Sequence, residues 1–301
     1  MTEKALYGIS NPNSRSLRQE AMIRFRRNKI AVVSFYVLVL LVVIALATLL
    51  IDFFTADAVY REYVIKQNLM NKLQPPSVAH PFGCDEFGRD ILFRILWGTR
   101  YSFFVGLFSV CISGTLGTML GTLAGFYGGK VDHMIMRVMD VFLAVPATIM
   151  AIAIVAALGT SMFNLLISIA LPRVPRFARV VRASVMSVRD QEFIEAARAV
   201  GASDARLIFA YILPNVIAPI IVQATLEIAQ SILNIATLSF IGLGVQPPVP
   251  EWGSILSSAR NYMRDAWHIT VFPGLAIMMT VLSLNLFGDG LRDAMDPKQK
   301  R

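Results

Sequence analysis

The chain contains 301 residues, of which 55% are hydrophobic and only 16% charged, whereas about a quarter of the residues in an average soluble domain are charged. Its mean hydropathy is +0.60. A soluble fold cannot bury so much apolar surface, so the composition indicates an all-α integral membrane protein. The net charge of +8 is read as topological, with no nucleic-acid partner implied. Cys84 lies in a polar loop and Cys111 in an apolar run, which excludes a disulfide scaffold.

Six apolar segments are predicted to cross the membrane. The first is free of charged residues and is about 33 Å long at 1.5 Å per residue, enough for a hydrocarbon core of about 30 Å. Pro172 and Pro175 interrupt the fourth, which membrane helices tolerate when neighbours satisfy the freed backbone groups. The six segments are Ile30–Ile51, Tyr101–Tyr127, Val138–Leu158, Phe163–Leu171 with an apolar and basic extension to about Val188, Ile208–Gly244 and His268–Gly288.

The distribution of Lys and Arg predicts the orientation. Twenty of the 28 basic residues fall in segments 1–29, 128–137, 172–206 and 289–301, and the other eight fall in 52–100 and 245–267. Because basic residues concentrate in cytoplasmic loops, both termini are expected in the cytoplasm of a multi-pass protein of the cell (inner) membrane. The expected organisation is a basic segment 1–29, a first helix 30–51, an extracytoplasmic loop 52–99, a five-helix core 100–290 and a cytoplasmic tail 291–301.

Two further elements are expected within these segments. Loop 52–99 is predicted to contain an interfacial helix that starts at Ile91 and is capped by Asp90. The cytoplasmic segment 187–206 is predicted to form a short helix that begins at Ser187-x-x-Asp190 and ends at Gly201, followed by a second helix start at Ser203. Its apolar residues Phe193, Ala197 and Val200 follow helical spacing and predict one stripe. An ordinary amphipathic surface helix would have the same pattern.

A polar stripe is predicted in the middle of the fifth span, at residues Gln223, Glu227, Gln230 and Asn234. Their spacing places them on one face of a helix. A bare carboxylate is costly in hydrocarbon, so this face is expected to contact protein or water. Two interpretations remain open: the stripe lines a passage for a charged or hydrogen-bonding solute, or Glu227 pairs with another helix or a second subunit.

The glycines at 117, 121 and 125 recur every fourth residue in the second span and predict close helix packing, within the chain or with a sister subunit. Residues 125–130 resemble a phosphate-binding loop only superficially, because Ala124 stands where its first glycine is required and Val131 where its hydroxyl residue is required. No zinc-protease or serine-hydrolase motif is present in the sequence. We therefore expect no catalytic residues, no bound metal and no cofactor.

The cytoplasmic segment resembles the EAA motif of ABC importer permeases. EAARAVG at 195–201 and YILPN at 211–215 match that motif in spacing, through residues Glu195, Ala196, Ala197, Gly201, Leu213 and Pro214. Tyr211 stands where isoleucine is frequent in the family. The resemblance implies that this segment is the coupling helix, which docks into a cleft of an ATP-hydrolysing subunit.

Three other segments are similar to the C-type permease subunit of dipeptide and oligopeptide importers. They are His80–Asp90, Leu238–Leu256 and Asn285–Pro297, and the basic entry Phe25–Lys29 also fits. Cys84 departs from the pattern, since threonine is common there. The resemblance covers nearly the whole chain.

This resemblance implies a type I importer permease with six membrane helices that translocates di- or oligopeptides through a path shared with a homologous permease. Two cytosolic ATP-binding subunits and an extracytoplasmic substrate-binding protein are the other implied partners, besides the lipid bilayer. The same family with a nickel-complex or other small-solute cargo is one alternative. An ion-coupled secondary transporter is another, although such folds usually carry internal repeats and several ionisable residues at the midplane. A structural membrane scaffold is the third.

Overall fold

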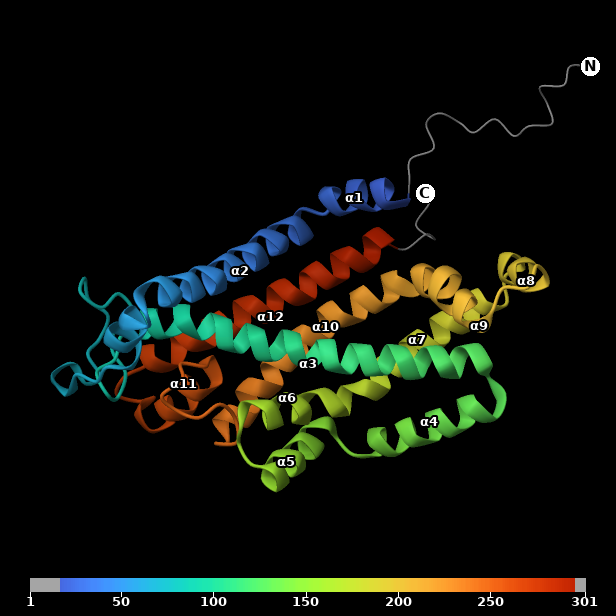
Figure 1. Cartoon of the computed structure of the whole chain (residues 1–301). Helices are drawn as coiled ribbons and strands as arrows, with labels where there is room; N and C mark the ends of the chain where they lie inside the picture. Colours follow the sequence, from blue (N-terminus) through green and yellow to red (C-terminus); the bar gives the residue numbers. More distant parts are fainter. Residues whose placement is uncertain (1–16, 296–301) are drawn as a thin grey trace, which may run out of the picture.

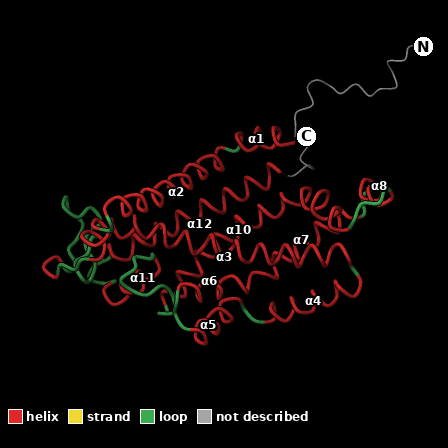
Figure 2. Tube along the Cα trace, in the orientation of Figure 1, coloured by secondary structure: helices red, strands yellow, loops and turns green. Residues whose placement is uncertain are grey.

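The computed structural model describes residues 17–295, and this part of the chain is mostly helical, without a β-sheet (Figures 1 and 2). Its α-helices are α1 (Leu17–Arg27), α2 (Lys29–Thr55), α3 (Ile91–Tyr127), α4 (Gly129–Ala144), α5 (Ala147–Leu158), α6 (Met162–Ala170), α7 (Val174–Arg189), α8 (Glu192–Ala199), α9 (Asp204–Arg206), α10 (Leu213–Phe240), α11 (Trp252–Ala259) and α12 (His268–Met295). A 3-10 turn, Leu171–Arg173, joins α6 to α7, and a π-helical turn, Leu207–Ile212, joins α9 to α10.

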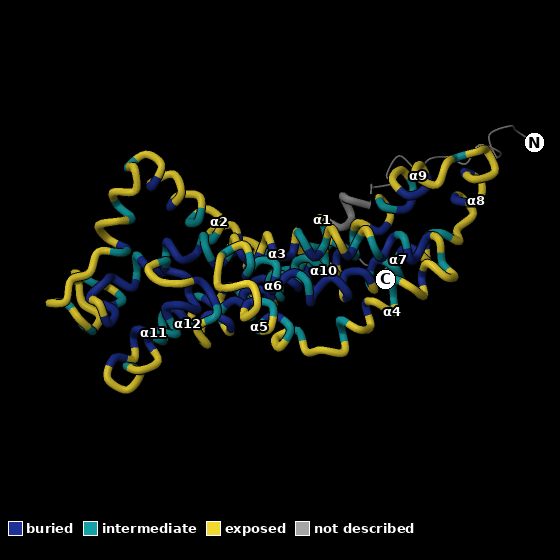
Figure 3. The backbone as a smooth tube through the Cα atoms, turned by 60° about the horizontal axis from the view of Figure 1, so that its bottom comes forward, coloured by how far each residue is buried: buried dark blue, intermediate teal, exposed yellow. Residues whose placement is uncertain are grey.

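The long helices run side by side along an elongated bundle, with most of the irregular loops at the end opposite α8 (Figures 1 and 2). Within the described residues, four helical runs are long and apolar enough to cross a membrane: α2, α3, the run Asp204–Phe240 and α12. The bent pair α4–α5 is a fifth candidate. The remaining expected span, the fourth along the chain, corresponds to α6 and α7. Buried segments follow the middle of the bundle, and the outer loops are largely exposed (Figure 3).

The third expected span is broken. Instead of one helix over Val138–Leu158, the structure has α4 and α5, whose axes are bent by 85°. The break lies at Val145, which is extended (φ −100°, ψ 128°) because the ring of Pro146 disfavours the helical conformation of the preceding residue. The segment is apolar enough for a membrane span, but the proline decides its shape.

The predicted interfacial helix is wrong as a separate element. Residues 91–100 form the first turns of α3, a single helix of 37 residues and about 55 Å. Asp90 caps it as expected, since its Oδ1 accepts a hydrogen bond from the Phe93 amide at 3.2 Å. No proline interrupts the sequence between this cap and the apolar run, so the helix continues from one into the other.

The fourth expected span is helical through both of its prolines. Pro172 lies in the 3-10 turn and Pro175 in the first turn of α7, where a missing amide hydrogen costs little. The helix continues to Arg189, so the predicted start at Ser187-x-x-Asp190 is wrong. The Ser187 hydroxyl donates to the Ser184 carbonyl at 2.8 Å, and Asp190 ends α7.

The glycine stripe of α3 packs within the chain, against α7. A Cβ atom on Gly117 would lie 2.3 Å from Phe177 Cβ, and one on Gly121 would lie 2.4 Å from the Ala178 carbonyl oxygen. Gly125 approaches the Arg182 carbonyl in the same way, at 2.9 Å. Because these three positions of α3 have no side chain, the backbones of α3 and α7 come into contact. Of the two expected partners, the stripe therefore packs within the chain and not against a sister subunit.

Near the start of the described chain, α1 packs beside α12. The Phe25 and Phe287 rings are 5.6 Å apart, and Asn28 caps α2 by accepting the Ala31 amide at 3.1 Å. α12 extends to Met295, so the start of the expected tail 291–301 is helical; residues 296–301, with the end of the Asn285–Pro297 motif, lie outside the described residues, as do residues 1–16.

Candidate coupling surface and intramembrane charge cluster

The helix that carries the EAA motif, α8, projects at one end of the bundle (Figure 1). Its residues Ile194 and Ala197 are buried in an apolar cluster built from α3, α7 and the π-helical turn. Phe126 of α3, Val185 of α7 and Leu207 of the turn are members of this cluster. Because three elements converge on its inner side, α8 is a fixed projection of the bundle.

The outer side of α8 is exposed and partly apolar. Phe193 is 40% and Val200 87% exposed, and Glu195 and Ala196 are also exposed. The predicted stripe Phe193–Ala197–Val200 is therefore wrong, because Ala197 faces the cluster while the other two face outward. The chain buries Ile194 instead, which lies one turn from Ala197. An eight-residue helix with apolar side chains on both faces is suited to contact a second protein.

The end of α8 confirms the prediction for Gly201. This residue has φ +87°, a left-handed conformation that glycine adopts without a steric penalty. The Gly201 amide donates to the Arg198 carbonyl and the Ala202 amide to the Ala197 carbonyl, both at 3.0 Å. Ser203 then caps the next helix by accepting the Arg206 amide, as predicted.

Leu213 and Pro214, the last two motif residues, lie where the π-helical turn passes into α10. The Leu213 amide donates to the Ile208 carbonyl, five residues back. Pro214 has no amide hydrogen and its ring crowds the carbonyl four residues back, so a proline is compatible with the wider turn that precedes it. Leu213 packs against the cluster under α8, whereas Pro214 is exposed. The six motif residues thus lie around one corner of the chain, where α8 is connected to α10.

Arg189 strengthens this corner, and sequence reasoning missed it. Its Nη1 donates to the Gly125 carbonyl at 2.9 Å and to the Phe126 carbonyl at 3.3 Å, satisfying carbonyls near the end of α3. Its Nε donates to Asp190 at 2.8 Å. The guanidinium therefore ties the end of α7 to the end of α3. An arginine in a last helical turn is too common to indicate such a contact.

The polar stripe of α10 contains a buried ion cluster. Glu227 is 3% exposed; its Oε2 accepts from Arg173 Nε and its Oε1 from Gln223 Nε2, both at 3.0 Å. Arg173 is equally buried and also donates to the Ile169 carbonyl at 2.6 Å. Arg176 Nη1 lies 3.6 Å from Glu227 Oε1. We call Arg173, Arg176 and Glu227 the midspan cluster.

The Glu227 carboxylate pairs with another part of the same chain, as one of the two open interpretations expects. Of the other stripe residues, Gln230 is exposed and Asn234 half-buried. The segment 172–206 is expected to be cytoplasmic, yet Arg173 lies beside the middle of α10, because helix continues through Pro172. Arginines three residues apart just after an apolar run were the available signal.

Buried charges hold the loop that precedes α3 in place. His80 Nδ1 lies 2.8 Å from Asp90 Oδ2, and Arg89 donates to Asp85 at 2.6 Å. Cys84 is fully buried between them, and burial, with these two carboxylates, raises the pKa of its thiol to about 11. Within residues 17–295, no group of three or more His, Cys, Asp or Glu side chains is arranged to hold a metal ion.

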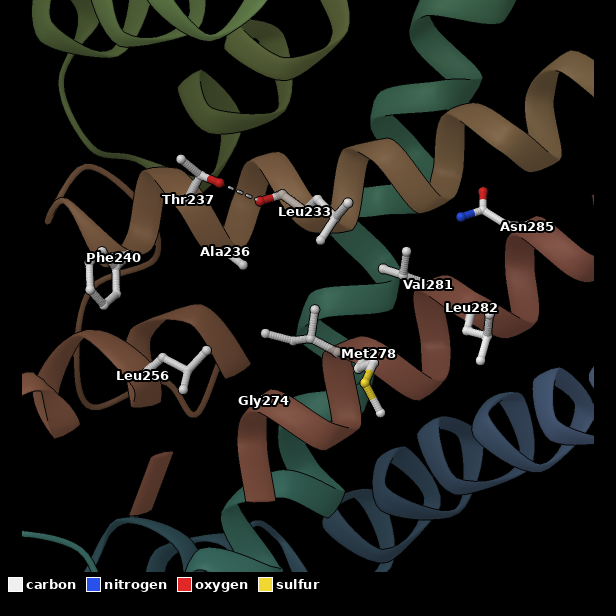
Figure 4. A pocket seen from close by; sticks show the side chains of 11 residues that line it. Leu233, Ala236, Thr237, Phe240, Leu256, Gly274, Met278, Val281, Leu282 and Asn285 are labelled. Carbon is white, nitrogen blue, oxygen red and sulfur yellow. Dashed lines mark hydrogen bonds between the residues drawn. The ribbon is translucent and has the colours of Figure 1, made fainter. Parts of the chain in front are cut away.

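A groove of about 590 Å³ lies on the outside of the bundle between α10, α11 and α12 (Figure 4). Its lining is almost wholly apolar; Thr237 donates its hydroxyl to the Leu233 carbonyl at 2.8 Å, and Asn285 is the other polar side chain. No charged group lines it, so it has no counterpart for the charged ends of a peptide.

The comparisons with known proteins extend over nearly the whole chain. Residues 117–301 match the family "Binding-protein-dependent transport system inner membrane component", and residues 16–76 match the N-terminal membrane domain of oligopeptide transport permease C. The chain is 47% identical to the dipeptide transport system permease protein DppC of Alkalihalophilus pseudofirmus, over 94% of this chain and 90% of the relative. It is 43% identical to the glutathione transport system permease protein GsiD of Pectobacterium atrosepticum, over 97% and 95%.

The fold agrees with these relatives. A chain of the methionine ABC transporter MetNI superposes with a TM-score of 0.56 at 16% identity, covering 68% of this chain and 97% of that one. This likeness confirms the expected all-α type I ABC permease fold. The expected family is likewise confirmed, and it replaces the alternatives of an ion-coupled carrier and a structural scaffold. The chain belongs to the family of binding-protein-dependent transport system inner membrane components.

Proposed function

We propose that this chain is one transmembrane subunit of an ATP-driven importer that carries di- and oligopeptides across the cytoplasmic membrane. A homologous permease would form the other half of the passage, two cytosolic subunits would hydrolyse ATP, and an extracytoplasmic protein would deliver the cargo. Both termini and α8 would lie in the cytoplasm. The chain itself would carry no catalytic residue.

The observation that carries this proposal is the construction of α8. Its inner residues are fixed in the core, while Phe193, Val200 and Glu195 are presented to a partner. A rigid projection transmits a displacement to the bundle, which a mobile loop would not do. The connection from α8 through the π-helical turn leads directly into α10, so a push on α8 would reach the helix that contains the midspan cluster.

Peptide cargo is supported by the relatives, which are named as dipeptide and glutathione transport permeases. Both cargoes are small solutes with several hydrogen-bonding groups and at least one free carboxylate. The half-buried and exposed amides of α10 at Gln223 and Gln230 are compatible with such a solute, because amides both donate and accept hydrogen bonds.

The test compares two exposed phenylalanines in the reconstituted transporter. Phe193→Ser removes an exposed phenylalanine side chain from α8. Phe54→Ser removes the same side chain from the far end of α2, where Phe54 is 79% exposed. We expect Phe193→Ser to reduce ATP-driven peptide uptake and transport-coupled ATP hydrolysis, and Phe54→Ser to leave both within about twofold of wild type.

A cysteine crosslink provides the second measurement. Ala196 is the better position, because Ala197 faces the core. Ala196→Cys should crosslink to an ATPase subunit carrying cysteines along its cleft. Normal coupling in Phe193→Ser together with no crosslink from position 196 would refute the role of α8.

A further inference from the structure

Five arginines lie along α7 and the turn before it, and four of them are hydrogen-bonded to a carboxylate. Arg173 bonds to Glu227 at 3.0 Å, Arg179 to Asp140 at 2.6 Å, and Arg189 to Asp190 at 2.8 Å. Arg182 forms a two-point pair with Asp132. These four charges are balanced locally.

Arg176 is the fifth, and its charge is in surplus. Its nearest carboxylate is that of Glu227, at 3.6 Å, which is beyond ordinary hydrogen-bond distance. Both oxygens of that carboxylate are already bonded, one to Arg173 and one to Gln223. Within residues 17–295, the Arg176 guanidinium has no hydrogen-bond partner, and its side chain is 53% exposed. One carboxylate between two guanidiniums leaves the midspan cluster with a net charge of +1.

The surplus charge lies deep in the bundle. Glu227 is near the centre of α10, a helix of 28 residues, so it lies about 20 Å from either end. Arg176 reaches the same depth because its guanidinium lies beside that carboxylate. A half-exposed guanidinium at this depth is costly against lipid tails, so its exposed side must face water or polar groups. Gln230, one turn along α10 from Glu227, is exposed as well.

We infer that Arg176 lines the translocation passage and binds the carboxylate of the cargo while it crosses. This inference rests on the proposed function and names the chemical group recognised. Guanidinium and carboxylate match in a two-point arrangement, and the donors of Arg176 are unoccupied. Glu227 keeps the guanidinium in place and reduces its net attraction, so the cargo is held briefly and released. The passage would therefore attract the carboxylate end of a peptide with a positive charge, and not its ammonium end with a negative one.

The test measures ATP-driven initial uptake into proteoliposomes that contain the complete transporter and its binding protein. Each variant receives a dipeptide with a free carboxyl terminus and the same dipeptide with an amidated terminus. The preference of the binding protein cancels in the ratio of variant to wild type. Arg176→Gln leaves the pair of Arg173 with Glu227 intact, so we expect normal assembly. Arg179→Gln is the matched control: its side chain is 55% exposed, and its partner Asp140 is exposed too.

Arg176→Gln should lower uptake of the free-carboxylate peptide about tenfold and that of the amidated peptide less than twofold. Arg176→Lys should recover part of the loss, because it keeps the charge without the two-point geometry. Arg179→Gln should affect both peptides equally. An equal loss for both peptides in Arg176→Gln, or no loss, would overturn the inference while leaving the proposed function in place. Failure of the wild-type transporter to take up either peptide would overturn both.

Thiol labelling tests the passage position without transport. A cysteine in place of Arg176 should react with an anionic, membrane-impermeant methanethiosulfonate in the assembled complex. Cys111 is the internal reference, because it is exposed on an apolar side of α3 together with Phe104 and Phe108. Labelling at position 176 and not at 111 supports a water-lined site. An unreactive position 176 in a properly assembled complex would refute it.

Discussion

Removal of the Glu227 charge should destabilise the permease, because Arg173 would remain buried without a counter-charge. Glu227→Gln keeps the shape of the side chain and one acceptor oxygen. Arg173 is 3% exposed and cannot recover its hydration in the folded state. Breaking a buried ion pair by removing one partner costs about 3–5 kcal/mol. At about 2–4 °C per kcal/mol, the midpoint of thermal unfolding should fall by at least about 6 °C.

The assay is thermal unfolding of the purified transporter complex in detergent, followed by the yield of assembled complex. Gln230→Ala is the control on the same stripe; its exposed side chain should contribute less than about 0.5 kcal/mol. A double variant, Arg173→Met with Glu227→Leu, removes both buried charges. It should be more stable than Glu227→Gln, because no uncompensated buried charge remains beside α10.

Two results would contradict this reasoning. A wild-type unfolding midpoint in Glu227→Gln would show that the pair contributes nothing to the folded state. A double variant no more stable than the single one would show that loss of packing, not loss of charge balance, destabilises the chain. Reduced uptake with full stability would instead assign Glu227 a direct role in the passage.

Four further outcomes are expected. Gly121→Leu should destabilise the bundle by about 1–3 kcal/mol, since the α7 backbone occupies the space its side chain needs; normal assembly yield would contradict the packing. Gly201→Val should cost about 1–3 kcal/mol of backbone strain and lower coupled ATP hydrolysis while insertion persists; wild-type coupling would contradict the role of that turn. With the other cysteine replaced by serine, Cys84 should alkylate slowly at pH 8 and about tenfold faster per pH unit up to about pH 11, because only the thiolate reacts; a rate that levels off by pH 9 would argue against a raised pKa. A cysteine at 60–75 should react with an impermeant reagent from outside the cell and one at 190–206 should not; the opposite result would reverse the orientation.

The sequence by itself determined those features that depend on neighbours along the chain. Apolar runs of sufficient length located the membrane segments, since each helix satisfies its own backbone hydrogen bonds and needs only an apolar surface. Asp90 and Ser203 were identified as helix caps and Gly201 as a helix end for the same local reason. The EAA spacing identified the family, which the comparisons confirmed.

The tertiary structure decided those features that depend on distant partners. Arg173 meets Glu227 across 54 residues of sequence, and no local pattern specifies that meeting. Which side of α8 faces the bundle depends on the apolar cluster beneath it, formed by α3, α7 and the π-helical turn. Ile194 fits into that cluster and is buried, whereas Phe193 stays exposed. The surplus charge of Arg176 emerged only once the carboxylates of α4 and α10 had been assigned to the other arginines, because charge balance at a site is a property of the packed bundle.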